Sequence, residues 1–276
     1  MMDTIERTFC DLVQCVAAIP GVQSVGRSGG RALPAQPSDG DIDVFLYCDA
    51  IPTRQGREAA LAALGPALEG VSVGVFGGGR WGEGDFARVQ GVETWLMYFT
   101  VEAADAEVDA VLSAGQPDKE GNYFYPTGRC AMYLGMDVLY DKAGFLKGMK
   151  ERLSVYPDDL VRKLAEHHLG ALGNGEDLER AVLRRDALFY HFALDLAIDH
   201  FLQALFAMNR VFFPSRKRSL EYIQGFRAKP DRCQERLLEV LRLGGAPESV
   251  EESYHIFAEL CNELRSLPRQ TDLTIL

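Results

Sequence analysis

The chain has 276 residues, which corresponds to about two domains of ordinary size. Hydrophobic residues make up 47% of it and charged residues 25%, a composition that excludes a disordered or collagen-like chain. The formal net charge of −11 argues against a protein that holds nucleic acids mainly through their phosphates, so we expect no stable nucleic-acid partner.

The sequence also bears on location and redox state. No apolar run reaches the roughly 18 residues of a membrane-spanning helix, and the first residues are too polar for a signal peptide. Six cysteines are present without CxxC or zinc-finger spacing. We therefore expect a cytoplasmic protein with no membrane partner and with free, mostly buried thiols.

The first half of the chain alternates between helical and strand-like patterns. Apolar spacing and turn residues predict helices over 3–18, 53–68 and 104–113. Strands are predicted over 22–25, 41–47, 71–76, 93–101 and 138–140. This pattern is typical of an α/β (α+β) domain with a mixed sheet, which we assign to residues 1–150.

The second half carries only helical patterns. Pro157 and Asp158 can begin a helix, and a long helical pattern covers 176–213. Further helices are predicted over 216–226, 231–243 and 249–267. We therefore predict an all-α helical bundle domain over residues 151–276.

The most informative segment is GRSGGRALPAQPSDGDIDVFLY, residues 26–47, in which Asp41 and Asp43 are separated by one residue on a predicted strand. Side chains alternate across a strand, so both carboxylates point to the same face. Two neighbouring carboxylates repel each other, and a bound cation relieves that repulsion. Mg²⁺ commonly takes one or two carboxylates together with substrate phosphates, so Asp41 and Asp43 are candidate metal ligands.

A glycine- and serine-rich loop precedes these acids. Gly26, Ser28 and Gly29 can bring bare backbone and a hydroxyl close to phosphate oxygens. A phosphate-binding loop followed by two carboxylates on a strand is a coherent site for a nucleotide and a metal ion.

The arrangement resembles the nucleotidyltransferase superfamily that includes the kanamycin and other aminoglycoside nucleotidyltransferases. That superfamily has a Gly-Ser pair, about ten residues, and then an acid–apolar–acid triplet; here Ser28 precedes Asp41 by 13 residues, within SDGDIDVF. The segment FLQALFAMNRVFFPSRKR, 201–218, resembles the helical domain that follows this fold in one group of bacterial nucleotidyltransferase-like proteins. The pair is Gly-Arg-Ser here, and Gly40 interrupts the usual run.

The resemblance implies a nucleotidyltransferase-like fold and Mg²⁺-dependent transfer of a nucleoside monophosphate from a nucleoside triphosphate (NTP) to a hydroxyl acceptor. Asp41 and Asp43 would hold Mg²⁺, and Ser28 with nearby backbone would hold the phosphates. The acceptor is expected to be an aminoglycoside-like small molecule, with a protein or RNA acceptor left open. A homodimer is a candidate assembly.

The superfamily places a third carboxylate on a following strand, and the matching segment here is VETWLMYFT, 92–100. In one register Trp95 occupies that position, so we assign the third carboxylate to Glu93, the nearest acid on the same face. Glu93 would bind a second metal ion or accept a proton from the acceptor hydroxyl. Lys217, in the basic run that follows Pro214, is expected to neutralise the triphosphate.

Three other functions stay open. Trp95 suggests a catalytically weakened nucleotide-binding protein. Arg184 or Arg185 with His191 resembles the Arg…His pattern of HEPN-type ribonucleases, since Arg184, His191 and Asp195 fall nearly on one face of a continuous helix. A toxin–antitoxin partner that nucleotidylates another protein is the third. His167 and His168 are adjacent, so we do not expect them to form a metal-binding pair.

Overall fold

The computed structural model describes residues 4–28, 33–34, 39–114, 125–173 and 175–267. The chain divides into two compact units, Met1–Ala110 with Arg129–Val155 and Val111–Gly128 with Tyr156–Leu276. The first holds a mixed sheet with helices and the second holds helices, which confirms the expected fold class. The division into domains 1–150 and 151–276 stays a prediction.

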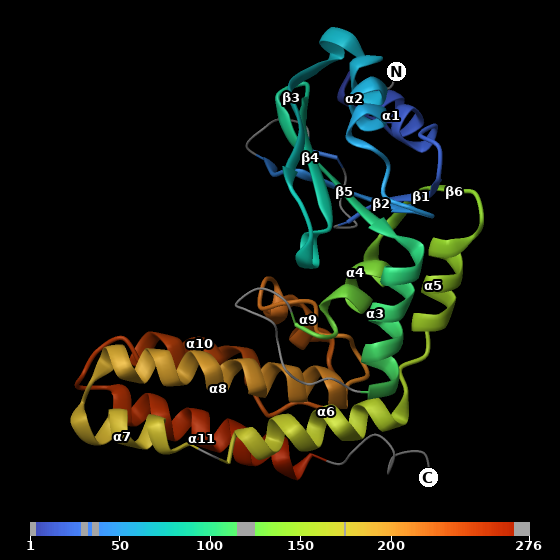
Figure 1. The fold of residues 1–276 in the computed structure, drawn as a ribbon. Helices are drawn as coiled ribbons and strands as arrows, with labels where there is room; N and C mark the ends of the chain where they lie inside the picture. Colours follow the sequence, from blue (N-terminus) through green and yellow to red (C-terminus); the bar gives the residue numbers. More distant parts are fainter. Residues whose placement is uncertain (1–3, 29–32, 35–38, 115–124, 174, 268–276) are drawn as a thin grey trace. The chain divides into compact units, whose positions relative to one another are not determined.

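The first unit is built on a six-stranded sheet with the order β3-β4-β5-β2-β1-β6 (Figure 1). Only β2 and β5 run parallel; the other neighbours are antiparallel. The strands are β1 (Val22–Arg27), β2 (Ile42–Cys48), β3 (Leu68–Phe76), β4 (Glu83–Val89), β5 (Val92–Thr100) and β6 (Asp137–Asp141).

One face of this sheet packs against α1 (Thr4–Ala17) and α2 (Arg54–Ala62), which lie side by side (Figure 1). Leu12 of α1 is fully buried in a core that includes Ile42 and Val44 of β2. Because side chains alternate along a strand, this packing turns Asp43 to the opposite face.

The opposite face is covered over the second half of β2. Tyr47 packs against Tyr133 of α4 (Gly128–Gly135) at 5.6 Å and against Phe145 of α5 (Phe145–Leu153) at 5.1 Å between ring centroids. Phe45 stacks on Phe99 of β5 at 6.1 Å, and α3 (Val101–Ala114) follows that strand. The aromatic side chains thus bury the end of β2, whereas Asp41 just before it is exposed.

One prediction for the first unit was wrong, and one strand was missed. The predicted helix over 53–68 ends at Ala62, because Gly65, with φ of +53°, begins a 3₁₀ turn and β3 begins at Leu68. β4 was not predicted, because its glycine and charged residues hide the alternation of buried Ala87 and Val89.

The second unit is a set of helices around α8 (Figure 1). They are α6 (Asp158–Ala171), α7 (Glu176–Arg184), α8 (Ala187–Met208), α9 (Ser219–Gly225), α10 (Cys233–Leu243) and α11 (Val250–Ser266). Phe201 and Leu205 of α8 are fully buried in one core with Val240 of α10 and Leu260 of α11. No helix among the described residues is long and apolar enough to cross a membrane.

The continuous helix predicted over 176–213 is also wrong. Arg185 adopts the left-handed conformation with φ of +51° and ends α7. Asp186 then begins α8, its carboxylate accepting a hydrogen bond from the N–H of Phe189 at 3.0 Å. After Met208 ends α8, Asn209 bonds the carbonyl oxygens of Leu205 and Ala228.

Candidate functional site

The two candidate metal ligands lie where β2 begins. Ile42 between them is 1% exposed and belongs to the core beneath α1, so alternation directs Asp41 and Asp43 away from that core. Asp41 is exposed and Asp43 is half-buried. Their carboxylate oxygens therefore remain within reach of a solvated cation, which fits the oxygen ligands and retained waters that Mg²⁺ prefers.

The start of the glycine- and serine-rich loop lies beside these acids. The backbone N–H of Ser28 donates to the carbonyl oxygen of Asp43 at 3.0 Å, which continues the pairing of β1 with β2. Gly29 lies outside the described residues. Ser28 is thus the described residue of this loop that lies nearest to Asp43 along the sheet.

Gly26 is held by packing inside the sheet. It pairs with Phe45 of β2 and Val138 of β6, and it is buried. A Cβ at this position would lie 2.2 Å from the sulfur of Met136, so a larger residue would displace that side chain. These contacts give Gly26 a packing role, and its predicted contact with a nucleotide stays a prediction.

The register of β5 determines which side chain stands next to Asp43. In the parallel pair, Asp43 is aligned with Trp95 and Ile42 with Thr94. The neighbour of Asp43 is therefore an aromatic residue, as one of the registers considered from the sequence had it. Continuing the same register brings Glu93 level with Asp41 on the same face.

Glu93 is engaged by the neighbouring strand. It pairs with Arg88 of β4 in the antiparallel ladder, and its carboxylate lies 3.5 Å from the Arg88 guanidinium. Both side chains are about half exposed, at 53% and 43%. Within the described residues Glu93 forms no three-ligand cluster with Asp41 and Asp43, so in this arrangement the pair of aspartates is the candidate Mg²⁺ site.

Aromatic side chains border the carboxylates. Trp95 lies 4.8 Å from Phe86 of β4 and 6.0 Å from Phe76 of β3 between ring centroids. Trp95 is half-buried, so part of its ring faces solvent on the side of Asp43. An aromatic face beside a phosphate-binding site can stack on a nucleotide base.

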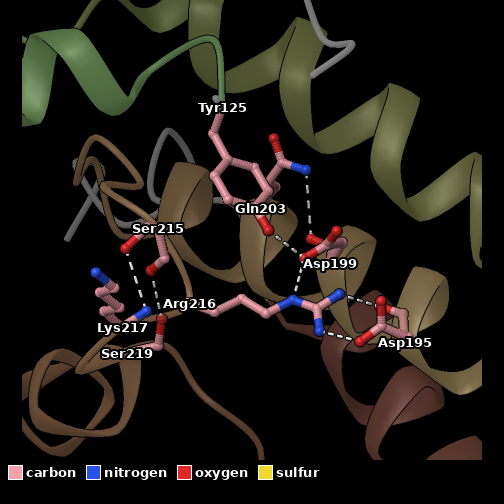
Figure 2. A network of polar contacts seen from close by, with 8 residues as sticks. All are labelled: Tyr125, Asp195, Asp199, Gln203, Ser215, Arg216, Lys217 and Ser219. Atoms are coloured by element: carbon pink, nitrogen blue, oxygen red, sulfur yellow. Dashed lines mark hydrogen bonds and ion pairs between the residues drawn. The ribbon is translucent and has the colours of Figure 1, made fainter. Parts of the chain in front are cut away.

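Lys217 belongs to the second unit, where Figure 2 draws its surroundings. Its side chain is exposed, and its backbone N–H donates to the hydroxyl of Ser215 at 3.1 Å. The role expected for Lys217 at the triphosphate stays a prediction.

Arg216, next to Lys217, is held by an internal network (Figure 2). Its guanidinium forms ion pairs with Asp195 and Asp199, and the hydroxyl of Tyr125 donates to Asp199 at 2.6 Å. Burial lowers the pKa of Arg216, but the hydrogen bonds to Asp199 and Asp195 raise it more, so the net shift is upward. Arg216 is thus a structural link between α8 and the segment that precedes α9.

The arrangement predicted for a HEPN-type site is wrong. Arg184 is the last residue of α7, whereas His191 and Asp195 lie on α8, after the break at Arg185. The face that these residues were expected to share on one continuous helix does not exist. His191 is exposed on α8.

The adjacent histidines belong to a group that includes a residue of another helix, and the expectation that the two form no metal-binding pair stays a prediction. The ligand atoms of His167, His168 and His200 all lie within 4.8 Å of one another, the one such three-residue group among the described residues. Sequence reasoning missed it because His200 comes from a different helix. The repeated histidines were the available signal.

The chain was compared with protein-family models, curated proteins and solved structures. A family model described as a domain of unknown function (DUF4037) matches residues 125–218, and no curated protein matches the chain. Among solved structures, the chain is similar to a nucleotidyltransferase-like protein from Exiguobacterium sibiricum 255-15 at 12% identity. That alignment covers 93% of this chain and 74% of the other, with a TM-score of 0.48.

Proposed function

We propose that the first unit is a Mg²⁺-dependent nucleotidyltransferase that moves a nucleoside monophosphate from an NTP to a hydroxyl acceptor. The observation that carries this proposal is the position of Asp41 and Asp43. They lie at the start of β2, where Asp41 is exposed and Asp43 half-buried, and they turn away from the α1 core, while the N–H of Ser28 donates to the backbone carbonyl oxygen of Asp43. The sequence pattern of the nucleotidyltransferase superfamily supports the same assignment.

Each residue has a separate task in this proposal. Asp41 and Asp43 hold Mg²⁺, which when bound neutralises the triphosphate and stabilises charge on the leaving pyrophosphate. The hydroxyl of Ser28 and the backbone that follows it hold phosphate oxygens. The half-buried ring of Trp95 stacks on the nucleotide base, which holds the α-phosphate at a fixed distance from the carboxylates.

Glu93 is the proposed general base. It is level with Asp41, and the acceptor hydroxyl gives up its proton as it attacks the α-phosphate. The carboxylate of Glu93 also lies 3.5 Å from the Arg88 guanidinium, so it must leave that partner to reach the acceptor hydroxyl. The acidic net charge of −11 favours a cationic, aminoglycoside-like acceptor.

A second candidate function is nucleotide binding without transfer. The observation that favours it is the alignment of Trp95 with Asp43, where an aromatic residue stands at the position of a third carboxylate. With two carboxylates the site can bind one Mg²⁺ with its nucleotide. Transfer of the nucleoside monophosphate would additionally require that Glu93 leave its ion pair with Arg88.

The test follows the α-phosphate of each of the four common NTPs, labelled with ³²P, in the presence of Mg²⁺. Water replaces an absent acceptor at low rate, so we expect labelled nucleoside monophosphate together with unlabelled pyrophosphate, because the α-phosphate stays with the nucleoside. Added aminoglycosides and a cell lysate show whether a small molecule or a protein takes the label.

The variants separate the two candidate functions. Asp43→Asn and Glu93→Gln should both stop label release, whereas Asp11→Asn on the exposed side of α1 should not change it. Mg²⁺-dependent binding of NTP without any release of label would support the second candidate function. Release that is unchanged in Asp43→Asn would contradict the proposal.

A further inference from the structure

Three of the five histidines of the chain meet between two helices of the second unit. His167 and His168 lie near the end of α6, and His200 lies in the middle of α8, which runs beside α6 (Figure 1). The Nδ1 atoms of His168 and His200 are 2.9 Å apart. The ring centroids of His167 and His168 are 4.9 Å apart, and those of His167 and His200 are 6.2 Å apart.

The distances suit a shared metal ion. Imidazole nitrogens bind Zn²⁺ at about 2.0–2.1 Å, so two of them on a tetrahedral ion stand about 3.3 Å apart. The distance of 2.9 Å between the Nδ1 atoms of His168 and His200 is near that value, and a small rotation of either ring lengthens it. The pair therefore does not need a movement of α6 or α8 to accept an ion.

His168 has the properties of a metal ligand rather than of a charged group. It is 1% exposed, and burial, followed by the charges of His200 and His167, lowers its pKa to about 3. Burial of this ring disfavours its charged form, and a metal ligand must be neutral. Its Nδ1 atom, which pairs with Nδ1 of His200, is the atom that the group offers to an ion, while its Nε2 atom is buried and has no hydrogen-bond partner.

The surroundings of the three histidines favour the binding of a cation that enters from solvent. His167 and His200 keep solvent access, and His200 also lines a cavity of about 690 Å³. Asp199, next to His200 in the chain, adds a negative charge that acts on His168. An ion entering this group would therefore meet neutral nitrogen ligands with a carboxylate nearby.

We propose that His167, His168 and His200 form a binding site for a divalent transition-metal ion, Zn²⁺, that links α6 to α8. Three imidazoles favour Zn²⁺ over Mg²⁺ or Ca²⁺, which take oxygen ligands. Three protein ligands leave the fourth tetrahedral position to water or to a small ligand. The site is separate from Asp41 and Asp43 and does not depend on the proposed nucleotidyl transfer.

The test uses the full chain, freed of metal with a chelator, and titrates it with Zn²⁺ by calorimetry. Metal analysis after gel filtration gives the stoichiometry, and Co²⁺ reports nitrogen ligands by its visible absorption. We expect one Zn²⁺ per chain, a rise in the melting temperature, and a Co²⁺ spectrum of tetrahedral type.

The variants define the ligands. His167→Gln and His200→Gln should each weaken Zn²⁺ binding at least about tenfold. Both have solvent-accessible side chains, so circular dichroism of the metal-free variants should match that of the parent protein. His255→Gln, on the exposed side of α11, is the matched control and should bind as the parent does. Asp41→Asn should also leave Zn²⁺ binding unchanged.

Two results would overturn the proposal. One is the absence of stoichiometric binding, which would leave the three histidines as a packed polar group only. The other is binding that His255→Gln weakens as much as His200→Gln does, because that indicates adventitious contact with surface histidines.

Discussion

Asp43 of β2 and Trp95 of β5 are aligned neighbours in the one parallel strand pair of the sheet. An acid and an aromatic ring thus stand side by side on the face that turns away from α1. Phe86 and Phe76 contact the aromatic ring, and the N–H of Ser28 donates to the backbone carbonyl oxygen of Asp43. This relationship decides how many carboxylates the candidate site offers to a metal ion.

Trp95→Asp should therefore make NTP binding depend more strongly on Mg²⁺, because it adds a carboxylate beside Asp43, although it also removes the ring proposed to stack on the base. Loss of the contacts with Phe86 and Phe76 should lower the free energy of unfolding by roughly 1–3 kcal/mol. Calorimetric titration with Mg²⁺ and a non-hydrolysable ATP analogue measures the first effect, and urea unfolding measures the second. Trp95→Phe is the control that lacks the carboxylate. An equal dependence of affinity on Mg²⁺ in both variants would contradict the metal site.

The buried pair of Arg57 and Asp85 should dominate the stability of the first unit. The carboxylate is fully buried, lies 3.2 Å from the guanidinium and accepts from the N–H of Gly74 at 2.8 Å. Burial raises the pKa of Asp85, although Gly74 and Arg57 oppose that shift. Asp85→Ala leaves Arg57 buried without this partner and should cost about 3–5 kcal/mol.

Glu83→Gln provides the comparison for that variant. The carboxylate of Glu83 also pairs with the Arg57 guanidinium, at 3.3 Å, but the Glu83 side chain is 41% exposed. Its removal should therefore cost about 1 kcal/mol or less in urea unfolding. Equal losses from Asp85→Ala and Glu83→Gln would mean that burial of the pair is not the cause.

The same contrast exists around Arg216 in the second unit. The side chain of Asp199 is 4% exposed and bonds both Arg216 and Tyr125, whereas that of Asp195 is 58% exposed. Asp199→Asn should lower the free energy of unfolding by about 2–4 kcal/mol and Asp195→Asn by about 1 kcal/mol. Thermal unfolding followed by circular dichroism compares the two, and the reverse order would show that the network is not centred on Asp199.

His168 should make the metal-free protein sensitive to acid. Its pKa is about 3 in the folded chain, below the value of about 6.5 for an unfolded histidine. The unfolded chain therefore binds the extra proton first, and stability present above about pH 6.5 is lost as the pH falls toward about 3. The loss reaches about 1.4 kcal/mol per pH unit, near the slope for one proton.

Urea unfolding between pH 4 and pH 7, with chelator present, measures this dependence. In His168→Leu the slope should fall by the contribution of one proton, whereas in His255→Gln it should not change. Burial lowers the pKa of His168 most. The neighbouring charges of His200 and His167 lower it further, and that of Asp199 raises it. A slope that is unchanged in His168→Leu would show that this histidine titrates normally in the folded chain.

Strand β2 and the face of its acids could be predicted from the sequence, because both depend on adjacent residues. The alternation of Asp41, Ile42, Asp43 and Val44 gave both the strand and the face of the acids. The neighbour of Asp43 was not determined in this way, because register depends on how β5 packs. Both Trp95 and Glu93 lie on the face in question, and only the fold distinguishes them.

In the second unit, sequence patterns did not predict one helix boundary or the contacts between helices. Apolar spacing continues through Arg185 and Asp186, so the break between α7 and α8 was hidden, although Asp186 is a good helix cap. The His167–His168–His200 group and the ion pairs of Arg216 join residues from distant parts of the chain. Such contacts depend on helix packing, which no spacing within one segment records.

The most direct test of the account is calorimetric binding of a non-hydrolysable NTP analogue in the presence and absence of Mg²⁺. We predict that the parent protein and Asp11→Asn bind the nucleotide only with Mg²⁺, and that Asp41→Asn and Asp43→Asn lose this binding. Equal Mg²⁺-dependent affinity in all four proteins would contradict the assignment of the metal site to β2.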